Sequence, residues 1–281
     1  MNILLKWLTA GGAAYAALLG LVFLLQAHLL YFPGVGRQVQ QTPKDLGLDY
    51  ETLWLTTEDG VRIEAWYVPA PGARGVALLA HGNAGNLSHR VGYAPLFHRL
   101  GYALLLFEYR GYGRSEGQPS EAGTYADARA AWHHLVAQRG VAPERIVLVG
   151  ESLGGAVVAR LAAAERPGAL VLASSFVSVP ELAAELYPWL PARWLARYHY
   201  DTLEAVSRLA CPVFIAHSRQ DEIVPFRHGQ RLFAAASEPK VFLEMAGGHN
   251  EGLLFTHEAW GQTLGHFLEQ HLPRDAMRST Q

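Results

Sequence analysis

The feature that most constrains the fold is an alternation of short apolar runs with longer segments of helical pattern. Short, nearly continuous apolar runs are typical of strands buried on both faces of a parallel sheet. The chain also begins this alternation with a predicted hairpin, residues 52–57 and 61–68 around an Asp-Gly turn. The apolar runs cover residues 75–80, 102–107, 146–149, 169–173, 213–216 and 241–245, and the helical segments cover 88–100, 120–139, 153–165, 227–236 and 252–271. We therefore predict an α/β fold whose mostly parallel sheet has helices on both faces.

Charge and motif content exclude several functional classes. The 281 residues carry a formal net charge of −2 and no basic stripe, so nucleic acid is not an expected partner. No HExxH or paired-cysteine pattern occurs, and no Walker or strand–GxGxxG–helix unit is present. We therefore expect neither a metal site nor a nucleotide cofactor.

The N-terminal segment differs sharply in composition from the rest of the chain. Residues 7–32 contain no Asp, Glu, Lys or Arg, and about 20 apolar residues suffice to cross a bilayer as a helix. Trp7 lies near one end and Tyr31-Phe32 at the other, where aromatic residues gather in membrane helices. We predict a transmembrane helix, with residues 1–36 as anchor and linker and residues 37–281 as the globular domain.

Two other interpretations of this segment stay open. A cleaved signal peptide is one, although the apolar stretch is longer than usual and no convincing A-x-A site follows it. A soluble helix packed on the domain is the other. Lys6 precedes the stretch while Arg37 and Lys44 follow it, so charge contrast is small. The predicted location is the membrane, with the extracytoplasmic side slightly favoured for the domain.

One connection is much longer than the others. Almost 40 residues separate the apolar run ending near residue 173 from the one starting near residue 212. Prolines interrupt its helical pattern, and it is rich in aromatic residues. We predict a small helical cap at about 176–208, lying at the carboxyl edge of the sheet, where open α/β sheets bind ligands. A longer surface connection with its own small core is the alternative. The candidate pocket residues in the cap are Phe176, Tyr187, Trp189 and Trp194.

A G-x-S-x-G motif occupies the junction of a predicted strand and helix. Gly150-Glu151-Ser152-Leu153-Gly154 follows the apolar run 146–149 and precedes the helical segment 153–165. In this context the serine is exposed on a sharp strand-to-helix turn at a helix N-terminus, which favours developing negative charge. Ser152 is therefore the candidate nucleophile.

A serine hydroxyl needs a base to act as a nucleophile. Asp221 follows the apolar run 213–216, and His249 follows the last run, after two glycines that allow its loop to turn back. We predict that His249 takes the proton of Ser152 and that Asp221 orients and stabilises the imidazole. The adjacent Glu222 is expected to be a solvated neighbour.

The loop after the run 75–80 supplies a candidate oxyanion hole. In folds with this motif, one donor is the backbone N–H after the nucleophile, and another comes from this loop. We assign the N–H groups of Leu153 and Asn83 to these roles. A plain glycine-rich turn is the alternative.

Five segments together resemble a known family. They are HGNAGN (81–86), YRGYGRSEG (109–117), GESLGG (150–155), DEIVP (221–225) and GGHNE (247–251). The chain resembles the α/β-hydrolase superfamily and, within it, the bud-emergence-type hydrolases, which include membrane-anchored lipid hydrolases and palmitoyl-protein thioesterases. Glu108 stands where relatives usually have Asp, and His217-Ser218 where they often have His-Gly.

The residues and the resemblance together predict a serine hydrolase. We expect it to cleave acyl esters or thioesters through an acyl-serine intermediate, without a cofactor, on a small-molecule or lipid-like acyl substrate. An aminopeptidase or amidase with the same three residues is one alternative. A membrane-tethered hydrolase fold without catalysis is the other, because folds outlive functions.

Overall fold

The computed structural model describes residues 3–272 and contains one eight-stranded sheet in the order β1-β2-β4-β3-β5-β6-β7-β8. The strands are β1 (Glu51–Thr56), β2 (Arg62–Val68), β3 (Gly75–Ala80), β4 (Tyr102–Phe107), β5 (Ile146–Glu151), β6 (Ala169–Ala173), β7 (Val213–Ser218) and β8 (Lys240–Met245). Strand β2 pairs antiparallel with both β1 and β4, and β3 to β8 are mutually parallel neighbours. The predicted leading hairpin and mostly parallel sheet are confirmed.

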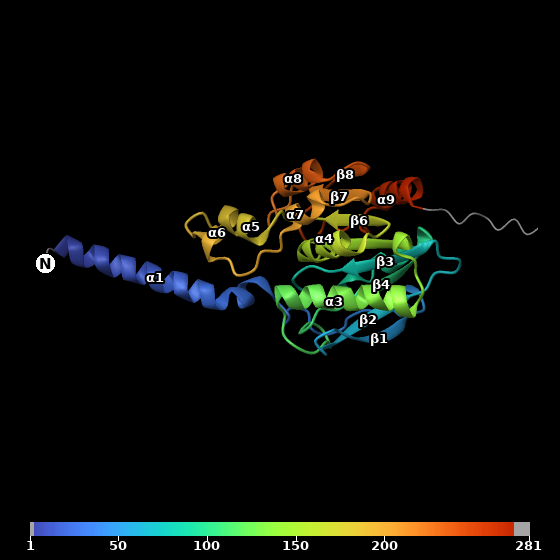
Figure 1. Cartoon of the computed structure of the whole chain (residues 1–281), viewed down its shortest axis with the longest axis horizontal. Helices are drawn as coiled ribbons and strands as arrows, with labels where there is room; N and C mark the ends of the chain where they lie inside the picture. Colours follow the sequence, from blue (N-terminus) through green and yellow to red (C-terminus); the bar gives the residue numbers. More distant parts are fainter. Residues whose placement is uncertain (1–2, 273–281) are drawn as a thin grey trace, which may run out of the picture.

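Helices cover both faces of this sheet, and each face has its own core (Figure 1). Along β3, Leu78 and Ala80 pack into one core while Ala77 and Leu79 pack into the other, because successive side chains of a strand point to opposite faces. One face carries α3 (Glu121–His133), α4 (Leu153–Glu165), α7 (Thr202–Ser207) and α8 (Arg227–Ala235), and the other carries α2 (Tyr93–Arg99) and α9 (Glu258–His271). Burial on both sides is the reason that the central strands β3, β4 and β6 are apolar throughout.

The last predicted helix begins later than the sequence pattern indicates. Residues 252–257 form turns, and α9 starts at Glu258. Leu254 is fully buried, and the ring of Phe255 lies edge-on to Tyr93 with 4.9 Å between centroids. The apolar pattern of 252–257 therefore reflects packing onto α2 and not an additional helical turn.

The long connection between β6 and β7 divides into two parts. Helix α7 packs against α4 and belongs to the sheet-covering layer. Helices α5 (Val179–Leu186) and α6 (Ala192–Leu195) stand beyond the carboxyl ends of the strands (Figure 1). We call residues 176–200, which carry α5 and α6, the cap. It is shorter than the predicted 176–208 because the α7 segment has a place on the sheet.

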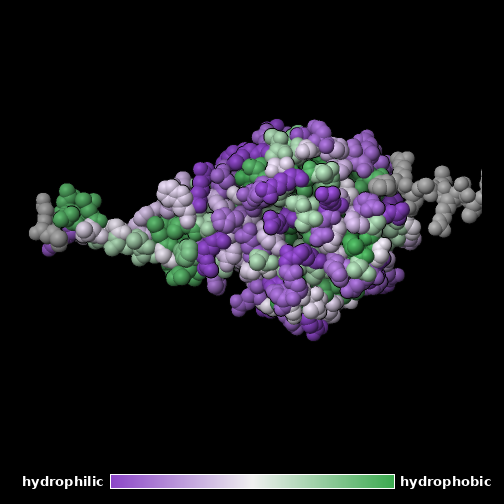
Figure 2. All heavy atoms as spheres, in the orientation of Figure 1, coloured by the Kyte–Doolittle hydropathy of each residue, from purple (hydrophilic) through white to green (hydrophobic). Residues whose placement is uncertain are grey.

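Helix α1 (Ile3–Leu30) projects from the domain as a single long rod (Figure 1). Its most apolar 18-residue window has a mean hydropathy of 2.0, and none of that window is buried. Figure 2 shows a mostly hydrophilic surface on the body and hydrophobic patches along the rod. Helix α1 is therefore not a buried helix of the domain core. The helix is long and apolar enough for a membrane anchor or a signal sequence.

Candidate active site

Ser152 stands at the turn between β5 and α4 in a backbone conformation that few residues adopt. Its φ is 50° and its ψ is −115°, which strains an L-residue and exposes its side chain at the helix N-terminus. Neighbouring glycines permit the turn. A Cβ on Gly154 would lie 2.1 Å from the carbonyl oxygen of Ala80, and one on Gly155 would lie 1.9 Å from Ser175 Oγ. The small residues of the motif are therefore required by close backbone packing.

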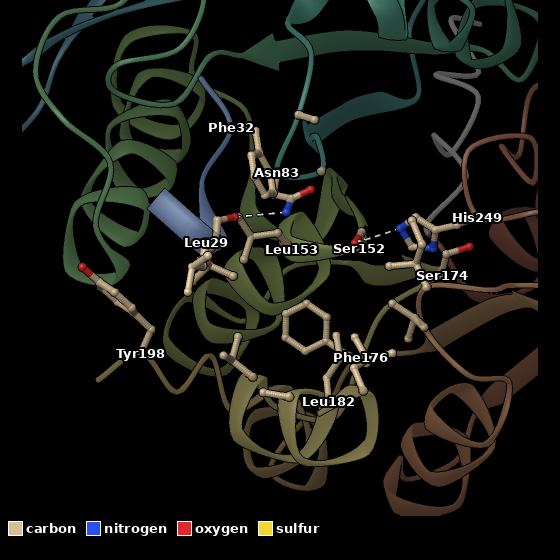
Figure 3. A pocket seen from close by; sticks show the side chains of 18 of the residues that line it. Leu29, Phe32, Asn83, Ser152, Leu153, Ser174, Phe176, Leu182, Tyr198 and His249 are labelled. Carbon is tan, nitrogen blue, oxygen red and sulfur yellow. Dashed lines mark hydrogen bonds between the residues drawn. The ribbon is translucent and has the colours of Figure 1, made fainter. Parts of the chain in front are cut away.

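The loop after β8 brings a histidine to this serine. His249 Nε2 lies 3.1 Å from Ser152 Oγ (Figure 3). His249 Nδ1 lies 2.8 Å from Asp221 Oδ2. Gly247, with φ of 90°, begins the turn that carries the histidine back over the sheet edge. The structure thus brings together the three residues that the sequence singles out, although 97 positions separate Ser152 from His249.

Asp221 is buried and held on both oxygens. Oδ1 accepts the backbone N–H groups of Ile223 at 3.0 Å and Val224 at 2.7 Å, and His217 Nε2 lies 3.4 Å from Oδ2. Burial raises the pKa of this carboxyl, but the hydrogen bonds from His217 and His249 and from the Val224 N–H outweigh it, and the pKa lies well below its ordinary value. The group is a carboxylate at neutral pH, as a partner for an imidazolium must be.

Glu222 has a role beyond that of a solvated neighbour. Its side chain is exposed, but Oε2 accepts the backbone N–H of His249 at 3.0 Å. A Cβ on Gly248 would lie 2.8 Å from the same oxygen. Glu222 therefore braces the histidine loop, and the sequence carries no signal for this because the partner is a backbone group 27 positions away.

The two candidate oxyanion donors come from the start of α4 and from the loop after β3. Leu153 is the first residue of α4, where N–H groups lack an intrahelical acceptor. Asn83 is fixed through its other polar atoms, because its carbonyl accepts the Phe32 N–H at 3.1 Å and its side-chain amide donates to the Leu30 carbonyl at 3.0 Å. Within residues 3–272, the backbone N–H groups of Leu153 and Asn83 donate no hydrogen bond to another protein group. Both residues line the cavity beside Ser152 and His249.

Glu108 anchors the Asn83 loop from beneath. One of its oxygens lies 2.8 Å from His81 Nε2, and the other accepts the Leu87 N–H at 3.1 Å. Glu108, His81 and Leu87 are all buried. Glu108 therefore ties both ends of the HGNAGN segment to the end of β4.

A second buried acid beside the nucleophile was missed by the sequence reasoning. Glu151 accepts a hydrogen bond from the Tyr93 hydroxyl at 2.6 Å and another from Arg90 Nε. Both Glu151 and Arg90 line the cavity. A charged residue ending a buried strand was the available signal, but Arg90 lies 61 positions earlier and nothing in the local pattern pairs the two.

A cavity of about 740 Å³ opens beside Ser152 and His249 (Figure 3). It lies between the sheet edge, the cap and the end of α1. Of the four predicted cap residues, Phe176, Tyr187 and Trp189 line it. Residues of α1, α5 and α6 also line the cavity, among them Val22, Gln26, Leu29, Leu30, Leu182, Ala192 and Leu195.

Trp194, the fourth predicted pocket residue, does not line the cavity. Its side chain is 92% exposed. Ala192 and Leu195 take the inward face of the single turn α6, and positions three apart share one face of a helix whereas Trp194 falls on the other. Aromatic content predicted a cap but not the orientation of each ring.

Cys211, another candidate nucleophile, has a structural role. Burial raises the pKa of the Cys211 thiol to about 11, and the residue packs against the core as a small hydrophobic side chain. Within residues 3–272, no group of three or more His, Cys, Asp or Glu side chains is arranged to hold a metal ion.

Comparisons with a family model, with known sequences and with solved structures all indicate the same fold. Residues 76–209 match the family model described as alpha/beta hydrolase fold. The alpha/beta hydrolase domain-containing protein WAV2 of Arabidopsis thaliana is 34% identical over 294 residues, covering 96% of both chains. Protein bem46 of Schizosaccharomyces pombe is 33% identical over 236 residues, covering 79% of this chain and 78% of that protein. An esterase of Pyrococcus furiosus has a similar fold, with a TM-score of 0.70 at 22% identity over 87% of this chain and all of the esterase chain. The resemblance to the bud-emergence-type proteins is confirmed.

Proposed function

Because the chain belongs to the alpha/beta hydrolase family, we propose that it is a serine hydrolase that cleaves acyl esters or thioesters through an acyl-serine intermediate. The observation that supports this most is the hydrogen-bonded series from Ser152 Oγ to His249 to the buried carboxylate of Asp221. Three residues from three separate sheet-edge loops meet in the order that nucleophilic catalysis requires.

The proposed reaction has two steps. Ser152 Oγ attacks the acyl carbon while His249 Nε2 takes the hydroxyl proton, and the same proton then passes to the departing alcohol or thiol. Water next attacks the acyl-serine, with His249 again accepting and returning one proton. The carboxylate of Asp221 stabilises the imidazolium in both steps. The N–H groups of Leu153 and Asn83 stabilise the tetrahedral oxyanion, each by about 3 kcal/mol in comparable sites.

The cavity supports an acyl chain as the substrate group. Its volume of about 740 Å³ lies within the range of small-molecule sites, about 300–1,000 Å³. Apart from Gln26, its walls away from Ser152 are aliphatic and aromatic side chains of the cap and of α1. An apolar cavity of this kind stabilises a bound hydrocarbon chain by removing it from water.

Aminopeptidase activity has less support from the same cavity. Binding a substrate amine would require a free carboxylate near Ser152. Among the described residues lining the cavity, Glu151 is the only carboxylate, and Arg90 and Tyr93 already hold it. The ester or thioester assignment is therefore the better supported one.

A substrate panel tests the proposed function. The full chain in detergent is assayed with p-nitrophenyl esters of two to sixteen acyl carbons, acyl thioesters and aminoacyl-naphthylamides, alongside a fluorophosphonate probe. We expect labelling by the probe and turnover of esters or thioesters at least tenfold faster than of the amides. Faster amide turnover would support the peptidase alternative, and a chain that neither labels nor turns over would be a non-catalytic hydrolase fold.

We propose further that α1 stays attached as a single-pass anchor. The full chain with a C-terminal tag is expected to stay in the membrane pellet after extraction at pH 11, with an intact mass that includes residues 1–36, because 28 helical residues exceed the hydrocarbon thickness. A soluble product lacking residues 1–36 would instead identify a signal sequence. Protease digestion of sealed vesicles of known orientation tests the favoured extracytoplasmic side.

A further inference from the structure

The apolar helix α1 is joined to the cap by its polar side chains. The Tyr15 hydroxyl donates to the carbonyl of Trp189 at 2.7 Å. Gln26 uses both ends of its amide, donating to the Leu195 carbonyl at 2.8 Å and accepting the Arg197 N–H at 2.8 Å. A polar group in an apolar medium is costly unless it is hydrogen-bonded. These bonds therefore make α1 and the cap one structural unit.

The same stretch of α1 forms a wall of the cavity. The residues that line it are Val22, Gln26, Leu29 and Leu30. Their spacing of four, seven and eight positions from Val22 places all of them on one helix face. At a rise of about 1.5 Å per residue, this face follows α1 for about 12 Å.

The two ends of the cavity differ in polarity. Ser152, His249 and Ser174 lie at one end, and Leu29 and Tyr198 lie on the other side (Figure 3). The Ser174 hydroxyl is buried and has no hydrogen-bond partner among residues 3–272. The Arg90–Glu151 pair adds charge near Ser152. An amphiphile would therefore bind with its ester near Ser152 and its hydrocarbon chain toward α1.

With α1 across a bilayer, as proposed above, Val22 at the outer end of the cavity's α1 wall lies within the hydrocarbon layer. A helix of 28 residues is about 42 Å long, and the hydrocarbon layer is about 30 Å thick. Wherever a layer of about 30 Å is placed within that length, the stretch from Tyr15 to Val22 lies inside it. The Trp189 carbonyl bonded to Tyr15 reaches the same depth. Trp194 and Tyr187 of the cap are 92% and 49% exposed, so in this placement they are accessible to lipid, where aromatic residues of membrane proteins gather.

We propose that α1 is a wall of the substrate site as well as an anchor, and that the acyl chain of a membrane lipid ester passes from the bilayer into the cavity along the α1 face that carries Val22 and Leu29. This inference rests on the proposed serine hydrolase function. It assigns a substrate class, a lipid ester already resident in the bilayer, and it makes Val22 a determinant of acyl-chain length.

Substitution of Val22 tests whether α1 forms a wall of the substrate site. The full chain is reconstituted in phosphatidylcholine nanodiscs, and the quantity measured is the ratio of kcat/KM for monopalmitoylglycerol to that for monobutyrylglycerol. We expect Val22→Trp to lower this ratio at least tenfold by filling the far end of the cavity, and Val22→Ala to leave it equal or raise it. Leu24 is 69% exposed and does not line the cavity, so Leu24→Trp and Leu24→Ala are matched controls that keep the native ratio.

The outcomes separate this inference from the proposed function. If the native protein hydrolyses neither ester and fails to label with the fluorophosphonate probe, the hydrolase proposal itself is wrong. If it is active but Val22→Trp and Leu24→Trp change the ratio equally, or neither changes it, α1 is only an anchor. If Val22→Trp does not fold, as judged by lost probe labelling, Val22→Ala provides the test. A lower ratio of kcat/KM for monopalmitoylglycerol to that for monobutyrylglycerol in Val22→Ala would contradict the role of α1 as a wall of the site. Turnover of an S-palmitoyl peptide in the same nanodiscs ten times faster than the glycerol ester would overturn the lipid-ester assignment.

Discussion

The Ser152→Ala protein is expected to hydrolyse acyl esters about 10⁶-fold more slowly than the native chain. Without Oγ there is no atom within reach of His249 Nε2 to form the acyl intermediate, because the 3.1 Å contact joins those two atoms. A residual rate above that in water is expected from the oxyanion donors and substrate binding, which the substitution leaves in place.

The measurement is kcat/KM for a p-nitrophenyl ester, with fluorophosphonate labelling as a second readout. Ser207→Ala is a matched control, since Ser207 lies exposed on α7 and its hydroxyl donates only to the Glu204 carbonyl one turn earlier. The control should keep native activity. Native-like turnover by Ser152→Ala would show that this serine is not the nucleophile.

Asp221→Asn is expected to lower kcat by about 10⁴-fold while leaving the fold intact. An asparagine keeps the shape but presents an amide where His249 Nδ1 meets a carboxylate at 2.8 Å. The imidazole would then lose the charge that stabilises its protonated form and would favour the wrong tautomer. KM should change much less than kcat, because Asp221 lies behind the histidine and does not line the cavity.

The control for this charge removal is Asp49→Asn. Asp49 is exposed and pairs only with Lys44 at the surface, where an ion pair contributes little. The activity of Asp49→Asn should equal that of the native chain. A loss of less than tenfold in Asp221→Asn, with native thermal unfolding, would mean that another acid such as Glu222 supports the histidine.

The sheet could be predicted from the sequence because burial dictates its composition. A strand covered by helices on both faces has no polar side, so β3 and β4 are visible as apolar runs such as Leu104-Leu105-Leu106. The three reactive residues were visible for a related reason. Ser152 follows β5 directly, Asp221 lies three residues after β7 and His249 four residues after β8. Parallel strands end at one edge, where these three residues meet.

The rest of the site depends on contacts that leave no local pattern. The approach of α1 to the cap joins Tyr15 to Trp189 across 174 positions, and neither residue belongs to a motif. Trp194 and Trp189 are equally aromatic in sequence, yet Trp189 lies in the turn between α5 and α6 and lines the cavity, whereas Trp194 falls on the outward face of α6. Bracing of His249 by Glu222 uses a backbone N–H, a partner that every residue but proline offers.

The backbone at Ser152 implies a trade-off between stability and activity. Its φ of 50° with ψ of −115° lies in a region where glycine is at ease and a serine is strained by about 1–3 kcal/mol. Ser152→Gly should therefore unfold with a free energy about 1 kcal/mol higher than Ser152→Ala, as measured by chemical denaturation in one detergent, while both are inactive. A chain selected for robustness alone would place glycine at this turn, so the serine marks a position where the protein gives up stability to keep its chemistry.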